Sequence, residues 1–169
     1  RHGYGNRNRI KTARGVQWLT VPLHLNGHLE KPICMVEIAK GNWARKHLRT
    51  IELAYQKAPY FERYFKPLSA IYAKEWRYLA GFNRALLDWI LFELGISIPI
   101  TCASEQGFDG KKSDLVFDMC LKMGATEYIF GSQGKDYADV EAFEKAGVKD
   151  RQKIMEAIET ATLTEDGRF

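Results

Sequence analysis

Long hydrophobic runs are absent from this chain of 169 residues, although 46% of its residues are hydrophobic. A helix that crosses a membrane needs about 20 consecutive apolar residues, so the sequence predicts no membrane span. The length is typical of one domain with a substantial core. We therefore expect residues 1–169 to form a single globular domain.

Cysteine is also scarce. Cys34, Cys102 and Cys120 form no C-x-x-C pair, have no metal-ligand spacing with the four histidines, and leave one thiol over if two of them pair. Free thiols are typical of reducing compartments. The sequence therefore predicts a cytoplasmic protein, and it assigns no residue as a metal ligand.

A large excess of charge of one sign is absent as well. The formal net charge is +4 and the sequence pI is about 8.9. This mild basic excess favours a ligand that carries phosphate or carboxylate, but it is well below what nucleic-acid-binding domains show. We expect a small anionic ligand and no nucleic acid.

The first half of the chain predicts a β-hairpin followed by helices. Residues 17–25 and 32–38 are rich in β-favouring residues and are joined by Asn26-Gly27, a strong hairpin signal. From Asn42 the apolar spacing becomes helical, and a helical hairpin is expected to follow. Its last helix, residues 74–94, carries a wide apolar stripe that predicts a core position, with Gly95 just beyond its end.

The second half predicts alternating strands and helices. Strands are expected at residues 96–101 and 127–130, and helices at residues 113–123, starting from Ser113 as cap, and at residues 138–145. This order is typical of βαβ units. The fold class is therefore α/β, with a parallel or mixed sheet flanked by helices, a helical hairpin insertion and the N-terminal hairpin.

The first candidate binding segment is residues 6–12, where cations alternate with amides. Guanidinium and ammonium groups bind phosphate or carboxylate, and asparagine can bind sugar hydroxyls. A solvated charged segment explains the same pattern. The candidates in this segment are Asn6, Arg7, Asn8, Arg9 and Lys11.

A second basic cluster opens the first helix. Arg45 and Arg49 are four residues apart and share a helical face, with Lys46 beside them. His47 points toward the apolar stripe instead. It is a candidate general acid or base, although a histidine on an apolar face is also typical of a satisfied core residue.

Two glycine-containing loops follow predicted strands, where open α/β sheets bind their ligands. Gly131, Ser132, Gly134 and Tyr137 lie in the later loop, and Lys112 lies in the earlier one. Close backbone approach and nearby polar groups suit an anion. Neither loop has the spacing of a P-loop or of a dinucleotide fingerprint, and ordinary strand-to-helix turns explain the glycines equally well. Cys120 is expected to be a small core residue.

Three of these segments together resemble the WbqC-like family. They are NRNRIKTARGVQWLTVPL at residues 6–23, NWARKHLRTIELAYQKAPYFERYF at residues 42–65, and GKKSDLVFDMCLKMGATEYIFGSQGKDY at residues 110–137. Genes of this family lie in O-antigen and capsule clusters, so the resemblance implies a cytoplasmic role in surface-polysaccharide biosynthesis. It implies a pathway but no reaction, cofactor or oligomeric state. The candidate residues named above all match the family's motifs.

Two departures from the family pattern affect these expectations. The strands that usually precede the NRNRIK segment are not in this sequence, so we expect the domain to lack them. After Gly147 the chain has an apolar periodicity that predicts a helix at residues 149–160, where the family has an extended segment.

Two functional hypotheses remain open. The first is a transferase that uses a sugar nucleotide or an activated acyl donor, with Arg7, Arg9 and Lys11 on the phosphates and His47 as general base. The second is a non-catalytic accessory protein that binds a glycan intermediate or a partner enzyme of the same pathway.

Overall fold

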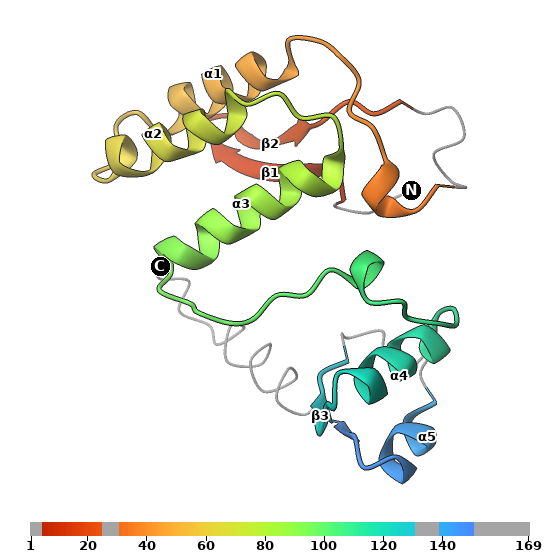
Figure 1. The fold of residues 1–169 in the computed structure, drawn as a ribbon. Coiled ribbons are helices and arrows are strands. Elements are labelled where there is room, and N and C mark those ends of the chain that lie inside the picture. Colours follow the sequence, from red (N-terminus) through yellow and green to blue (C-terminus); the bar gives the residue numbers. More distant parts are fainter. Residues whose placement is uncertain (1–4, 25–30, 131–138, 151–169) are drawn as a thin grey trace. The chain divides into compact units, whose positions relative to one another are not determined.

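The computed structural model describes residues 5–24, 31–130 and 139–150 (Figure 1). The chain divides into two compact units, Arg1–Ile98 and Pro99–Phe169. Helices and strands are mixed, as predicted, but the described residues form two separate two-stranded sheets in place of the larger flanked sheet. Whether the whole chain is one domain stays a prediction. No helix within the described ranges has the length and apolar character needed to cross a membrane.

The N-terminal hairpin pairs the beginning of the first predicted strand with a segment that was not predicted as a strand. β1 (Arg7–Thr12) pairs antiparallel with β2 (Gly15–Thr20), and Gly15, with φ 103°, follows the tight turn. The sequence prediction missed β1 because Ile10 is its only strongly apolar residue, so the strand has no hydrophobic alternation.

The predicted second hairpin strand, residues 32–38, is present only in part. Ile33–Met35 form a short 3-10 helix, η1, which begins after Pro32 because proline lacks the N–H that a strand ladder uses. The antiparallel pairing expected between residues 17–25 and 32–38 is observed as one bridge, between Leu23 and Ile38.

Three helices follow, as the apolar spacing predicted. They are α1 (Trp43–Tyr55), α2 (Phe61–Tyr72) and α3 (Leu79–Glu93). Pro67 lies inside α2, which continues with one fewer internal hydrogen bond. Gly95, with φ 67°, ends α3 as predicted.

Helix α3 begins later than the predicted residue 74 because the chain before it is extended. Ile38 N donates to Arg77 O at 2.8 Å, and Leu79 N donates to Val36 O at 2.9 Å. A bridge between Glu37 and Tyr78 lies between these two bonds. Pairing with the segment after η1 therefore holds Arg77 and Tyr78 out of the helix.

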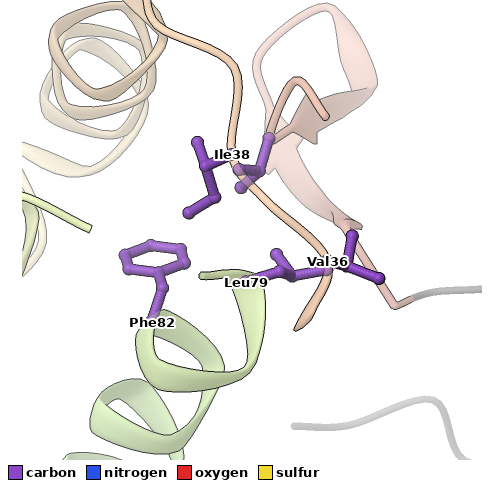
Figure 2. Close-up of a cluster of buried hydrophobic side chains, with 5 residues drawn as sticks. Val36, Ile38, Leu79 and Phe82 are labelled. Atoms are coloured by element: carbon purple, nitrogen blue, oxygen red, sulfur yellow. The ribbon is translucent and has the colours of Figure 1, made fainter. Parts of the chain in front are cut away.

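The core of the first unit lies where this pairing meets α3. Figure 2 shows Val36, Ile38, Leu79 and Phe82 gathered at the start of the helix, and Val21 completes the buried cluster. The predicted core stripe of α3 is confirmed only at this end, because Leu87, Ile90 and Leu94 are 43%, 45% and 65% exposed.

The second unit contains one βαβ arrangement. Its elements are η2 (Ala103–Glu105), α4 (Ser113–Lys122), β3 (Glu127–Tyr128), α5 (Val140–Lys145) and β4 (Lys149–Asp150). β3 and β4 are parallel and are joined through α5. The buried cluster of this unit contains Cys120, which confirms it as a core residue, and burial raises the pKa of its thiol.

Three predictions about the second unit were wrong. Residues 96–101 form no strand, because their only apolar alternation is interrupted by Pro99. Residues 149 and 150 form β4 instead of starting a helix, because Lys149 N donates to Thr126 O. Ser113 does not cap α4, because its hydroxyl oxygen accepts from Asp139 N at 3.2 Å. Residues 151–160 of the predicted tail helix lie outside the described residues.

A glycine is required at position 110, just before α4. Gly110 has φ 93°, and a Cβ added there would lie 3.0 Å from Asp114 C and Leu115 N. We predict that Gly110→Ala lowers the free energy of unfolding by about 1–3 kcal/mol, measured by urea denaturation. Gly5→Ala, where nothing lies near the added carbon, is the control. Equal stability of the two variants would contradict this description of the α4 entry.

Candidate functional site

The predicted cations of the first segment lie on one face of the β1–β2 hairpin. Successive side chains of a strand point to opposite faces, so Arg7, Arg9 and Lys11 share a face. Arg9 pairs in register with Trp18, which lies on the same face. The guanidinium carbons of Arg7 and Arg9 lie 4.5 and 5.5 Å from the centroid of the Trp18 ring. These cation–π contacts restrict both guanidinium groups while leaving Trp18 42% exposed.

The two predicted asparagines bond to the chain's own backbone. Asn6 Nδ2 donates to Val21 O at 2.9 Å, which extends the hairpin beyond the end of β1. Asn8 Oδ1 accepts from Arg9 N at 2.8 Å. These bonds give Asn6 and Asn8 a structural role. The binding of a ligand by these side chains stays a prediction.

Helix α1 is bonded to both strands of the hairpin. Near its start, His47 Nε2 lies 3.1 Å from Thr20 O. At its end, the Tyr55 hydroxyl accepts from Lys11 N at 3.1 Å. Leu19 of β2 is buried, and it lies on the opposite face from Trp18. The helix therefore packs along the hairpin, from its open end toward its turn, and Figure 1 shows α1 beside β1 and β2.

His47 lies in the buried region between α1, α2 and the hairpin. It is 6% exposed and has ring contacts with Trp43 and Tyr72. Because the Thr20 carbonyl can only accept, Nε2 carries the proton, and Nδ1 accepts from the Tyr72 hydroxyl at 3.4 Å. Burial lowers the pKa of His47 below its usual 6.5. The geometry is that of a satisfied core histidine, the alternative that the sequence left open.

The second basic cluster lines an open groove of about 650 Å³ beside α1. We call it the α1 groove, and its lining residues are Gln17, Arg45, Lys46, Arg49 and Thr50. The structure thus brings the predicted Lys46 and Arg49 together. Gln17 was not predicted as a site residue. It lies two residues before Leu19 in the same strand, so both side chains point to the same face, and this spacing could have indicated it.

The charges of the α1 groove are only partly compensated. Arg49 forms an ion pair with Glu52, with Nη1 and Oε2 2.7 Å apart. No acidic residue lies in the first turn of α1. Arg45 and Lys46 have no acidic partner among the residues that the structure describes. The groove therefore presents two uncompensated cations to solvent.

The remaining predicted residues belong to the second unit. Lys112 belongs to the second unit, where it precedes α4 with φ 52° and an exposed side chain. Gly131, Ser132, Gly134 and Tyr137 lie outside the described residues. Convergence of the glycine loops with the cationic segment stays a prediction. Within the described ranges, no three His, Cys, Asp or Glu side chains are grouped as metal ligands.

The environment of His47 predicts a specific pH dependence of stability. Because the folded-state pKa lies below 6.5, the unfolded chain binds more protons just below this pH, so stability is lost as the pH falls from 6.5 through the folded-state pKa. The wild type should therefore lose more stability than His47→Gln between pH 7.5 and 5.5, measured by urea denaturation. His24→Gln, at an exposed position, is the control. Identical pH profiles for wild type and His47→Gln would contradict the burial of a neutral imidazole.

Comparison with known proteins gives the same family as the sequence motifs. The chain is 33% identical over 145 residues to the uncharacterized protein Rv1507c of Mycobacterium tuberculosis, an alignment that covers 85% of this chain and 63% of that protein. The chain thus spans less than two thirds of this relative. No solved structure matches the chain. The profile of the WbqC-like protein family matches residues 1–159. The chain therefore belongs to the WbqC-like protein family.

Proposed function

We propose that the chain acts in bacterial surface-polysaccharide biosynthesis, in the cytoplasm, by binding a donor that carries phosphate. The pathway is supported by the family and its occurrence in O-antigen and capsule clusters. The donor class, a sugar nucleotide or an activated acyl compound, is supported by the cations of the first unit. The name of the mycobacterial relative indicates no activity.

The α1 groove is the observation that carries this proposal. Arg45, Lys46 and Arg49 repel one another, and Arg45 and Lys46 stand at the helix end where the macrodipole disfavours cations. This placement costs stability, and a bound phosphate would offset that cost. A groove of about 650 Å³ is within the usual size of small-ligand sites.

The hairpin supplies a second set of cations for the same class of ligand. Arg7, Arg9 and Lys11 lie on the Trp18 face, with the two guanidinium groups restricted by the indole. Preplaced cations stabilise the charge that develops on a leaving phosphate. Lys112 and the loop of Gly131, Ser132, Gly134 and Tyr137 match the family's motifs, and we propose them separately as ligand-binding residues of the second unit.

The reaction class that fits these groups is group transfer from a donor that carries phosphate. With a sugar nucleotide, an acceptor oxygen bonds to the donor carbon, the carbon–oxygen bond to the phosphate breaks with its electron pair on oxygen, and the acceptor proton passes to a base. With an acyl thioester such as acetyl-coenzyme A, the acceptor oxygen bonds to the carbonyl carbon, the carbon–sulfur bond breaks with its electron pair on sulfur, the acceptor proton passes to a base, and the phosphates serve only for binding. Both ring nitrogens of His47 are already bonded, so we assign His47 to holding α1 on β2. To act as the general base that the sequence suggested, His47 would have to break these hydrogen bonds.

Because both ring nitrogens of His47 are hydrogen-bonded, the structure also favours a second candidate function. A chain that binds the donor or a glycan intermediate without transferring it would need the cations but no base. This accessory role is distinguished from the transferase by product formation: binding without transfer in the complete protein would favour it.

Removal of one groove cation tests the proposal. We predict that UDP-glucose or acetyl-coenzyme A binds saturably and that Lys46→Ala weakens binding about tenfold or more, because a hydrogen bond to a charged group contributes about 1.5–3 kcal/mol. Isothermal titration calorimetry measures the affinity, and Arg9→Ala tests the hairpin cations in the same way.

The matched control is Lys66→Ala, which removes an exposed lysine of α2 that lines none of these features. It should bind as the wild type does. Absence of binding by both ligands at millimolar concentration, or equal weakening by Lys66→Ala, would overturn the proposal.

A further inference from the structure

A second cavity in the first unit, of about 740 Å³, shares no lining residue with the α1 groove. It is lined by the segment after η1, the first turn of α1, and the connection between α2 and α3. We call it the aromatic cavity, because Trp43, Tyr72 and Trp76 line it. We propose that the aromatic cavity binds a pyranose that carries a negative charge. This inference rests on the proposed function and names the sugar part of its ligand.

The three rings of the aromatic cavity are fixed in place. All three contact Phe82, with centroid distances of 5.2 Å for Trp43, 5.1 Å for Tyr72 and 5.9 Å for Trp76. Trp76 Nε1 donates to Ile71 O at 2.8 Å, and the Tyr72 hydroxyl donates to His47 Nδ1. A preformed surface loses little entropy when a ligand binds.

The rings also remain accessible. Phe82 is buried, whereas Trp43, Tyr72 and Trp76 are only partly buried and line the cavity. A pyranose has a face of C–H groups that can pack on an aromatic surface, with hydroxyl groups around its edge. Apolar aromatic walls with a few convergent polar groups are typical of small-molecule sites.

The charged groups at the rim of the cavity determine which sign of charge the ligand should carry. Glu37 accepts from Arg77 at 2.9 and 3.1 Å, so these two charges compensate each other. Lys40, Lys74 and Glu75 are exposed lining residues. None of these three has an ion pair among the residues that the structure describes.

This rim supplies two ammonium groups and one carboxylate. Ammonium groups donate to hydroxyl and acidic oxygens, and a carboxylate accepts from hydroxyls. The positive excess favours an anionic sugar over a neutral one. A sugar carboxylate and a sugar phosphate share this chemistry, and the experiment separates them.

The four indole N–H groups provide a test specific to the cavity. In ¹⁵N-labelled protein we expect glucuronate or glucose 1-phosphate, at millimolar concentration, to shift the Trp43 and Trp76 indole signals saturably. Trp89, whose indole donates to Glu93, should not shift. Glucose should bind several-fold more weakly. Comparison of glucuronate with glucose 1-phosphate identifies which anionic group is preferred.

Lys74→Ala should raise the dissociation constant about fivefold, and Lys66→Ala should leave it unchanged. The proposal is overturned if no sugar shifts Trp43 and Trp76, if glucose binds with the same dissociation constant as the anionic sugars, or if inorganic phosphate alone produces the same shifts.

The outcome is separable from that of the donor-binding proposal. Loss of nucleotide binding in Lys46→Ala concerns the α1 groove, whereas the Trp43 and Trp76 signals report on the aromatic cavity. Glucuronate binding at these indoles in a chain that binds neither UDP-glucose nor acetyl-coenzyme A would support the cavity and overturn only the donor proposal.

Discussion

Helix α1 is held along the β1–β2 hairpin by two hydrogen bonds to backbone groups, one on each strand. His47 donates to the carbonyl of Thr20, and the hydroxyl of Tyr55 accepts from the amide of Lys11. His47 is buried, so loss of its bond would leave a polar group poorly satisfied. The position of α1 depends on these bonds, and the two candidate binding features of the first unit depend on the position of α1.

The first turn of α1 separates these two features. Trp43 and Ala44 line the aromatic cavity, whereas Arg45 and Lys46 line the α1 groove. Consecutive residues of one helical turn thus face surfaces of different chemistry, one aromatic with a mixed rim and the other cationic. In our account a sugar and a phosphate are recognised by these separate surfaces, and the buried imidazole of His47 fixes the helix that carries both.

Local patterns predicted the parts of this fold that depend on local physics. The apolar spacing from Trp43 onward gave the helices, and Gly95 marked the end of α3. Strand β1 could not be predicted in this way, because its cations and amides obscure the alternation and its partner is set by a turn. Arg77 and Tyr78 lie outside α3 because of pairing with residues 36–38, a contact between segments far apart in the chain. Lys46 and Arg49 were predictable from helical spacing, whereas the aromatic cavity joins three segments that only the tertiary structure brings together.

The state of the His47 imidazole tests the central claim most directly. Long-range ¹H–¹⁵N correlation spectra distinguish the two neutral tautomers from the imidazolium. We predict a neutral ring at pH 7 with the proton on Nε2, as donation to the Thr20 carbonyl requires. A proton on Nδ1, or a doubly protonated ring at that pH, would contradict the placement of α1 and both binding surfaces that depend on it.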